Sequence, residues 1–442
     1  MRALILAYDF PPYVSVGGLR PYSWYRYLKE SGVEPIVVTR QWANEFGDER
    51  DYIAPSATDT VQVEQSESGT IIRTPFRPNL SNRLLLRHGS GRHRLLRKAV
   101  TAWYEVVQYY ADVGPRAPLV EAARGYLRSH RVDAIVATGN PYVLFRFASE
   151  LSREFGIPWV ADYRDPWSQD KRRHLCRASL WWNRALERKL VASASAVTTA
   201  NDAFRHVLAG LHTGKSVVVI PNGYDPEAMA AAHGVAPDPD HLRLAYTGST
   251  YLWHPIESVF RELDAFVRTD PSPPLLLDMV GVGDRGALES LLARSFPALA
   301  RRTEFTRRLA NDEMARRLAG AHALLVFNNY AYPGTKIYDC LALRRRILLC
   351  YSEDAEAERL RREHYNIDVS DDDDVHAHER MVEAAAAGTV VRDAAHLRET
   401  LAALHRELVE TGTVSCDSRN IEQYSRRAGA GRLAALLREI VR

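Results

Sequence analysis

The chain is poor in cysteine and has no long apolar run. Its four cysteines lie far apart among 442 residues and form no CxxC pair. A disulfide framework or a structural zinc site is therefore not expected, and the reduced thiols of a cytoplasmic protein fit this pattern better. No stretch reaches the roughly 18 uninterrupted apolar residues that a membrane-spanning helix needs. We expect a soluble protein that at most lies at the inner face of a membrane.

A strong charge bias is also missing, because the formal net charge is only +3. That balance does not indicate a nucleic-acid-binding protein. The sequence has neither a GxSxG nucleophile motif nor a GxxxxGK[ST] phosphate loop. It does have the 46% apolar and 26% charged residues of a soluble globular protein. Its length predicts two domains of about 200 residues each.

The chain opens with a βαβ pattern. Residues 3–7 (ALILA) form an apolar run that is typical of a strand buried on both faces. The loop DFPPYVSVGG, a helix pattern at 19–29 and a second strand at 35–39 follow it. Gly17 and Gly18 lie just before this helix, where their small size lets the backbone approach an anionic ligand. A plain flexible turn explains the two glycines equally well.

Residues 82–98 (NRLLLRHGSGRHRLLRK) differ from the segments around them. They combine arginine, lysine and leucine and contain no acidic residue. Such a segment is suited to contact with anionic lipid headgroups. A solvated helix and loop is the alternative interpretation.

Two later strands end in polar residues. Residues 134–137 (AIVA) precede Asn140, and residues 158–161 (PWVA) precede the segment DYRDPW. In open α/β sheets, ligands bind beside the carboxyl ends of the strands. The site residues expected here are Asn140, Asp162, Arg164, Asp165 and Trp167. The alternative is a structural turn held by salt bridges among Asp162, Arg164 and Asp165.

The second half repeats the α/β pattern. Strand-like runs at 242–247, 275–281, 303–305, 323–327 and 347–351 alternate with helix patterns, which predicts a second doubly wound domain. Residues 281–286 (GVGDRG) match the GxGxxG dinucleotide fingerprint, and Glu304 follows about 20 residues later. NAD(P) binding is therefore an alternative function. A Rossmann domain, however, carries this motif after its first strand, and here it follows the second.

The stretch 331–343 (AYPGTKIYDCLAL) follows an apolar strand and begins a helix near Thr335. Lys336 beside the free N–H groups of that helix suits a phosphate, and Asp339 can accept a hydrogen bond from a sugar hydroxyl. The alternative is a helix capped by Thr335 that packs on the strand. Residues 371–374, with His376, His378 and Glu379, have metal-ligand types, but we interpret them as an acidic loop before a helix and expect no metal site.

These segments, taken in order, resemble the GT-B glycosyltransferases of the family-4 (group 1) type. The similar motifs are AYDFPPYVSVGGLRPYSWYRYLKESG, VADYRDPW, IPNGYD, LAYTGSTY and YPGTKIYDCLA, followed by the terminal YSR…LAALLREI. VADYRDPW is similar to a block of a bacterial subgroup linked to exopolysaccharide or cell-surface glycan assembly. The resemblance implies an α/β fold of two Rossmann-like domains that face each other across a cleft. The implied parts are an acceptor-side domain (1–225), a linker (226–240), a nucleotide-sugar domain (241–415) and a crossover helix (416–442) that packs back on the first domain.

The resemblance also implies an activity. It is a retaining transfer of a sugar from a nucleotide sugar, a UDP- or GDP-sugar, to a glycan, lipid-linked or small-molecule acceptor, with no metal or other cofactor. The catalytic residues implied are Arg164, Asp165 and Lys336. The donor residues implied are Gly17, Gly18, Thr247, Gly248, Ser249, Arg307, Leu309, Thr335, Lys336 and Asp339. Asn140, Asp162 and Trp167 are expected on the acceptor side.

Three departures from the family pattern bear on activity. The acid expected eight residues before Asp339 is Ala331, and Asp339 itself stands where Glu is usual. Arg164 replaces a histidine, and the loop TYLWHP offers His254 where the family often supplies Arg or Lys. A catalytically weak protein that only binds a nucleotide sugar is therefore a further alternative.

Overall fold

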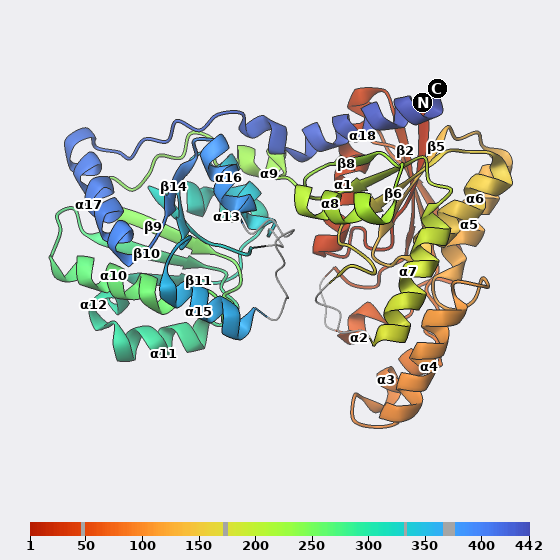
Figure 1. Cartoon of the computed structure of the whole chain (residues 1–442), viewed down its shortest axis with the longest axis horizontal. Helices are drawn as coiled ribbons and strands as arrows, with labels where there is room; N and C mark the ends of the chain where they lie inside the picture. The colour runs from red at the N-terminus through yellow and green to blue at the C-terminus, as the bar shows by residue number, and fades with distance from the viewer. Residues whose placement is uncertain (46–48, 171–175, 331–333, 366–375) are drawn as a thin grey trace. The chain divides into compact units, whose positions relative to one another are not determined.

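The computed structural model describes residues 1–45, 49–170, 176–330, 334–365 and 376–442 (Figure 1). The chain divides into two compact units. The first contains residues 1–222 and 426–442, and the second contains residues 223–425. Each unit is a largely parallel sheet with helices around it, so the expected α/β class with two Rossmann-like domains is confirmed. None of the helices described is both long enough and apolar enough to pass through a lipid bilayer.

The first unit has an eight-stranded sheet in the order β3-β4-β2-β1-β5-β6-β7-β8, in which β3 alone runs antiparallel to its neighbour. Its strands are β1 (Arg2–Leu6), β2 (Glu34–Arg40), β3 (Gln62–Gln65), β4 (Thr70–Thr74), β5 (Ala134–Gly139), β6 (Trp159–Tyr163), β7 (Ala196–Thr199) and β8 (Val217–Val219). Its helices are α1 (Val16–Tyr27), α2 (Glu49–Tyr52), α3 (Leu80–His88), α4 (Arg94–Val107), α5 (Ala117–Ser129), α6 (Val143–Phe155), α7 (Arg177–Val191), α8 (Asp202–Leu211) and α18 (Arg426–Val441), and the 3-10 helix η1 is Leu28–Ser31.

The second unit has a six-stranded parallel sheet in the order β11-β10-β9-β12-β13-β14. Its strands are β9 (Leu242–Thr247), β10 (Leu275–Val280), β11 (Thr303–Thr306), β12 (Ala323–Phe327), β13 (Arg346–Cys350) and β14 (Gly388–Val391). Its helices are α9 (Pro226–Ala230), α10 (Ile256–Arg268), α11 (Arg285–Ser295), α12 (Pro297–Ala300), α13 (Asn311–Ala319), α14 (Lys336–Ala342), α15 (Ala355–His364), α16 (Ala377–Ala384) and α17 (Ala394–Thr411), and the 3-10 helix η2 is Ile421–Tyr424.

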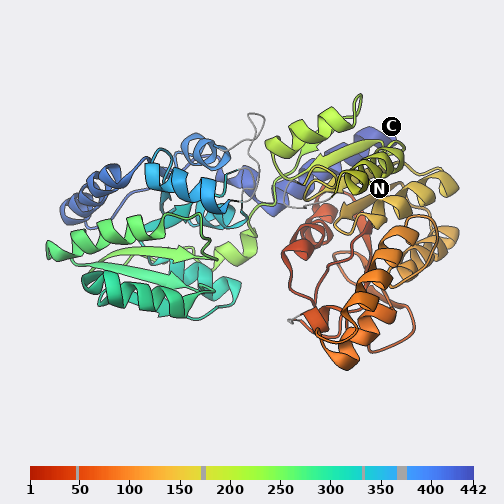
Figure 2. The same ribbon diagram turned by 60° about the horizontal axis from the view of Figure 1, so that its bottom comes forward.

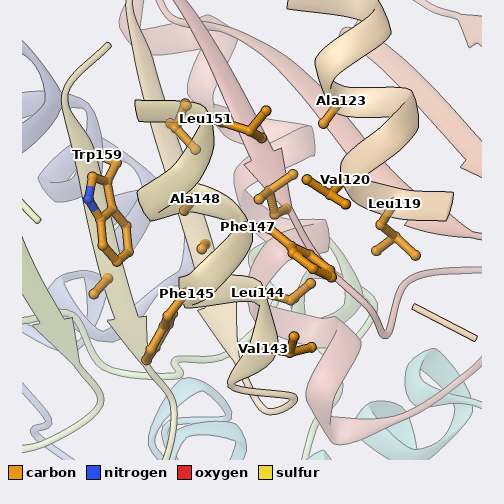
Figure 3. Close-up of a cluster of buried hydrophobic side chains, with 14 of the residues drawn as sticks. Leu119, Val120, Ala123, Val143, Leu144, Phe145, Phe147, Ala148, Leu151 and Trp159 are labelled. Carbon is orange, nitrogen blue, oxygen red and sulfur yellow. The ribbon is translucent and has the colours of Figure 1, made fainter. Parts of the chain in front are cut away.

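The apolar run of β1 explains its place in the middle of the first sheet. Leu4 and Leu6 join the hydrophobic cluster on one face, while Ala3 and Ile5 join the cluster on the other. Helices therefore cover both faces, as the absence of alternation in this run predicts. Figure 3 shows part of the first cluster, with Val120 of α5 on one side of α6 and Trp159 of β6 on the other.

Helix α18 completes the second cluster of the first unit. Its Leu433 and Leu437 are fully buried in the same cluster as Ile5 and Trp24. Helix α18, the dark-blue helix at the C-terminal end of the colour bar, lies with the first unit in both Figure 1 and Figure 2. The return of the C-terminal helix onto the first domain is thus as expected.

The chain passes between the units at two places, 222/223 and 425/426. Residues 226–240, expected as a linker, lie in the second unit and begin with α9. Residues 416–425, expected as part of the crossover, also lie in the second unit. The two connecting segments meet there, because the Tyr224 N–H donates to the Tyr424 carbonyl at 3.0 Å.

Candidate functional site

Each sheet has one point where the strand order reverses. In the first sheet β1 lies between β2 and β5, and in the second β9 lies between β10 and β12. Ligands of open α/β sheets bind beside the carboxyl ends of the strands at such points. A ligand site is therefore expected at the loop after β1 in the first unit and at the loop after β9 in the second.

The loop after β1 brings a carboxylate and a guanidinium together over a glycine. The Ser15 hydroxyl donates to Asp9 Oδ2 at 3.0 Å and accepts from the Gly18 N–H at 3.1 Å, capping α1. A Cβ on Gly17 would overlap both the Asp9 carboxylate and the Arg164 guanidinium. The close approach of these two side chains therefore requires glycine at position 17. Gly18 is less constrained, because a Cβ there lies 3.4 Å from the nearest backbone atoms.

Arg164 and Asp165 follow β6 at the same edge of the sheet. They form an ion pair of 3.5 Å between Nε and Oδ2, and each side chain is about a quarter exposed. Tyr142 fixes the loop, because its hydroxyl donates to the carbonyls of Asp165 and Pro166, both at 2.9 Å. The two charged groups are thus held in place and remain accessible to a ligand.

Asp162 and Trp167 instead lie in the interior of the first unit. The Asp162 carboxylate is fully buried and accepts hydrogen bonds from Arg20, Thr138 and Thr198. Trp167 is buried and stacks on the Tyr142 ring at 4.9 Å. Both residues support the loop that carries Arg164 and Asp165. Asn140, the third residue expected on the acceptor side, is exposed just after β5.

An aromatic cluster beside Asp9 was missed by the sequence interpretation. The Tyr52 hydroxyl donates to Asp9 Oδ1 at 3.2 Å, and its ring lies 5.2 Å from that of Trp42. Tyr13 stacks on Trp42 at 4.2 Å. Burial and the Asp9 carboxylate raise the pKa of Tyr52, so its hydroxyl keeps its proton and donates. Asp9 was detectable, because it follows β1 as Asp165 follows β6, but its tyrosine partner comes from a distant segment.

In the second unit, three predicted donor residues meet around Met314 of α13. The Thr247 hydroxyl lies 3.8 Å from Met314 Sδ, and Lys336 Nζ lies 3.6 Å from the same sulfur. Gly248 has a φ of +114°, and a Cβ there would lie 3.7 Å from Lys336 Cγ. The structure thus brings Thr247, Gly248 and Lys336 together at the strand-order reversal of the second sheet.

Lys336 and Asp339 interact directly. Lys336 Nζ lies 3.5 Å from Asp339 Oδ2, and the lysine side chain is 45% exposed. An ion pair this exposed contributes only about 0–1 kcal/mol, so a ligand can separate the two charges. Helix α14 has only seven residues, which limits its dipole. Thr335 is its N-cap residue and the helix packs against β12, as the alternative expected, but the Thr335 side chain makes no capping hydrogen bond. The positive charge of Lys336, rather than the dipole of α14, is therefore the main feature here that favours an anion.

The loop from Ser249 to His254 carries no charged side chain other than the histidine. The Tyr246 hydroxyl donates to the Ser249 carbonyl at 2.7 Å, while the Ser249 side chain points to an exposed surface region. His254 is buried, stacks on Phe327 at 4.9 Å and lies 3.2 Å from Asn329 Oδ1. Burial lowers the pKa of His254 to about 4, and the hydrogen bond to Asn329 offsets this only in part. His254 is therefore neutral at pH 7 and does not replace the missing Arg or Lys.

Arg307 and Leu309 lie on the loop between β11 and α13. Arg307 is exposed, and Leu309 is half-buried against the cluster that contains Met314. The same loop approaches the end of β10, since a Cβ on Gly281 would lie 3.4 Å from Arg308 Cα. Leu309 therefore lies beside the Met314 cluster, and Arg307 is exposed to solvent.

The GxGxxG motif does not have the surroundings of a dinucleotide site. It follows β10, beside the strand where the order reverses, and Gly283 and Gly286 have open space where a Cβ would lie. Neither glycine is needed for a close approach. Glu304, the expected ribose ligand, accepts from Arg243 at 3.1 Å and also pairs with Arg317. Burial alone would raise the pKa of Glu304, but these two guanidinium groups lower it.

Two expectations fall partly or wholly outside the described residues. Ala331 lies in 331–333, and the acidic run 371–374 lies in 366–375. Of the neighbouring residues, His376 Nδ1 lies 2.9 Å from Glu379 Oε2, and Asn328 Nδ2 donates to Glu379 Oε1 at 3.2 Å. Within the described ranges, no three His, Cys, Asp or Glu side chains are placed to hold a metal ion.

Comparisons with known proteins agree with this architecture. Residues 17–223 match the family described as the glycosyl transferase 4-like domain. Sucrose-phosphate synthase from Thermosynechococcus elongatus has a similar structure, with a TM-score of 0.60, 15% identity and coverage of 99% of this chain and 98% of that one. HepE from Anabaena in complex with UDP has a TM-score of 0.54 at 14% identity, covering 99% and 100% of the two chains. Trehalose-6-phosphate synthase from Burkholderia multivorans has a TM-score of 0.53 at 13% identity, covering 99% and 96%.

A shorter similarity connects the chain to a different class of protein. Precorrin-6A reductase from Mycobacterium tuberculosis is 30% identical over 99 residues, which are 19% of this chain. The chain matches 41% of the length of that relative.

Proposed function

We propose that this chain, which has the GT-B fold and carries a glycosyl transferase 4-like domain over residues 17–223, transfers a sugar from a nucleotide-sugar donor. The observation that carries the proposal is the cluster of Thr247, Gly248 and Lys336 at the strand-order reversal of the second sheet. A backbone turn with positive φ beside a half-exposed lysine suits a diphosphate. HepE, which has a similar fold, is a UDP complex, and this favours a UDP-sugar as the donor.

The residues have distinct roles in the proposed reaction. The bond between the sugar C1 and the diphosphate oxygen breaks, and Lys336 stabilises the charge that develops on that oxygen. Asp339, released from its 3.5 Å contact with Lys336, accepts from a hydroxyl of the nucleotide ribose. The acceptor oxygen bonds to C1 and loses its proton to the departing diphosphate. We propose that it attacks from the face that the leaving group vacates, which retains the anomeric configuration.

Arg164 and Asp165 are proposed to orient the reacting sugars. Both belong to the first unit, and Tyr142 holds their loop. The guanidinium suits a phosphate or a sugar hydroxyl, and the carboxylate accepts from hydroxyl groups. Gly17 serves this pair by leaving room for Arg164 beside Asp9. Thus Arg164 and Asp165 select and place substrates, and Lys336 assists departure of the diphosphate.

Metal independence is part of the proposal. Lys336 supplies positive charge at the diphosphate that a divalent cation supplies in other transferases. EDTA is therefore expected to leave the transfer rate unchanged, with added Mg²⁺ and Mn²⁺ as the matched comparison. Loss of activity in EDTA that either ion restores would contradict this part.

The first experiment is a thermal-shift screen of UDP-, GDP-, ADP- and TDP-sugars, followed by a transfer assay with the donor that stabilises the chain most. Stabilisation by one nucleotide class supports the proposal, and release of free nucleotide diphosphate on adding an acceptor identifies transfer. Binding without release over long incubation indicates a protein that only binds nucleotide sugars. Stabilisation by NAD or NADP alone indicates an oxidoreductase. That outcome would favour the alternative function suggested by the motif at 281–286 and by the partial similarity to a reductase.

The acceptor is proposed to be a glycan, a lipid-linked glycan or a small molecule, and no nucleic-acid partner is proposed. The proposed location is the cytoplasm, with peripheral contact between residues 82–98 and the inner face of a membrane. The exposed Arg83 and Arg87 of α3 and Arg94 of α4 support that contact.

A further inference from the structure

Helix α4 has an apolar face that is open to solvent. Leu95, Leu96, Trp103 and Val106 are all exposed, with Leu95 at 83% and Trp103 at 54%. With the exposed Ala99 and Ala102, these residues follow the i, i+1, i+4, i+7, i+8, i+11 spacing that places side chains on one side of a helix. No residue of α4 is buried. Apolar side chains at this spacing normally face a core, and here they face water.

The opposite side of α4 is already occupied by α3. The Ser81 hydroxyl lies 2.8 Å from that of Thr101 and donates to the Arg97 carbonyl at 3.2 Å. The Arg97 guanidinium in turn donates to the Ser90 carbonyl in the connecting turn at 3.1 Å. These contacts fix the rotation of α4 about its axis. The outward direction of the apolar face is therefore a property of the fold.

The charges beside this face are basic, except for Glu105 near its end, which pairs with Arg116 at 3.1 Å. Between positions 68 and 104 the chain contains no Asp or Glu. Arg94 and Lys98 are exposed on α4 itself, and Arg92 is exposed in the turn before it, while the exposed Arg83 and Arg87 belong to α3. A second copy of this chain would bring the same cations to the contact and be repelled. An anionic surface with an apolar layer beneath it satisfies both features.

The position of the two helices suits such a surface. In Figures 1 and 2 the orange helices α3 and α4 extend from the end of the first unit opposite the N and C marks. The C-terminal end of α4 is connected to the candidate site through Arg116. Its Glu105 accepts from Arg116 at 3.1 Å, and the Arg116 guanidinium lies 5.5 Å from the ring of Tyr8, next to Asp9.

We infer that the apolar face of α4, residues 95–106, inserts into the headgroup region of an anionic phospholipid bilayer, with Arg92, Arg94 and Lys98 on the lipid phosphates. This extends the peripheral location in the proposed function and moves the contact from residues 82–98 toward Trp103 and Val106. Leu85, within the earlier segment, is buried and does not take part. Tyr110, which follows the end of α4 in the chain, is also exposed.

Vesicle flotation of the full chain tests the inference without any donor. Phosphatidylcholine vesicles with phosphatidylglycerol are compared with vesicles of phosphatidylcholine alone. We expect binding to the anionic vesicles only, weakened by salt. The double variant Leu95→Glu/Trp103→Glu is expected to lose about tenfold or more in partitioning, because two apolar side chains leave the bilayer. Both positions are exposed, so its melting temperature is expected to stay the same.

The matched control is Val409→Glu, which places the same charge on an exposed position of α17 in the second unit. It is expected to float like the unaltered chain. Absence of flotation with anionic vesicles, or equal flotation of the double variant, would overturn the inference. A change from dimer to monomer in the double variant, measured by light scattering without vesicles, would assign the face to a second copy and also overturn it. Donor binding, measured separately by thermal shift, reports on the proposed function.

Discussion

Arg20 and Asp162 form a fully buried ion pair that joins α1 to β6, with 2.7 Å between Nη2 and Oδ1. Arg20 also donates to the Ile220 carbonyl, and the second carboxylate oxygen accepts from Thr138 at 2.9 Å. The pair therefore connects four segments, namely α1, β5, β6 and the residue after β8, beneath the loop of Arg164 and Asp165. Of the two carboxylates in DYRDPW, one stabilises the sheet and the other is accessible to a ligand.

This difference gives the first prediction. Asp162→Asn is expected to destabilise the first unit by about 3–5 kcal/mol, because it leaves the Arg20 charge buried without its counterion. Asp165→Asn is the matched control, since its side chain is partly exposed and its ion pair contributes little. Chemical denaturation of both variants measures the contrast. Equal stability of the two would contradict the structural role of Asp162.

Asp165→Asn also tests the proposed reaction. Because the carboxylate is proposed to orient a sugar, the variant is expected to reduce turnover more than donor affinity. Steady-state transfer rates and donor binding are measured on the same preparation. Unchanged turnover would remove Asp165 from the reaction.

The two neighbouring glycines give a second matched pair. Gly17→Ala is expected to displace Arg164 or Asp9 and lower the transfer rate by about tenfold or more, since a misplaced group of about 1 Å has large effects on rate. Gly18→Ala has room for its methyl group and is expected to stay near the original rate. The opposite order of the two rates would show that Gly17 does not serve the site.

Lys336→Ala is expected to weaken binding of the nucleoside diphosphate by about 1.5–3 kcal/mol, because one charge-assisted contact is lost. Stability should hardly change, as the lysine is half exposed and its ion pair is weak. Lys336→Arg is the control that keeps the charge and is expected to recover part of the affinity. Calorimetric titration measures all three proteins, and an unaltered affinity in Lys336→Ala would contradict the phosphate role.

His254 predicts a pH dependence of stability. Its folded pKa is about 4, against 6.5 in the unfolded chain. Between these values the unfolded chain binds a proton that the folded chain does not, so the free energy of unfolding falls as the pH falls. The slope is about 1.4 kcal/mol per pH unit, or about 2 kcal/mol between pH 6.5 and pH 5. His254→Gln is expected to remove this contribution in denaturation measured at the two pH values, and an identical pH dependence would contradict it.

Apolar runs were sufficient to predict most of the fold. The run at 3–7 overlaps β1 except for its last residue, the run at 323–327 is β12, and the amphipathic end of the chain forms part of α18. The strand β14 (Gly388–Val391) was missed, because a run of four residues with a glycine carries little pattern.

The candidate site was only partly readable from the sequence. The sequence interpretation ended β6 at residue 161 and put both carboxylates in a loop, whereas the strand continues to Tyr163 and carries Asp162 inside. One or two residues at a strand end thus decide whether a carboxylate is structural or accessible. Contacts such as Tyr52 with Asp9, or Met314 with Lys336, join segments far apart in the chain, and periodicity gives no information about them.

The path of the chain through α18 has a consequence for synthesis on the ribosome. The first unit lacks Leu433 and Leu437 until about 200 further residues of the second unit have been made, since 223–425 come between. At roughly 5–20 residues per second, this delay lasts about 10–40 s. During that time the nascent first unit exposes the surface around Ile5 and Trp24 that α18 later covers. The second unit is made without interruption and is therefore expected to reach its final structure before the first unit does. A chaperone that binds the nascent chain during the delay would act on the first unit.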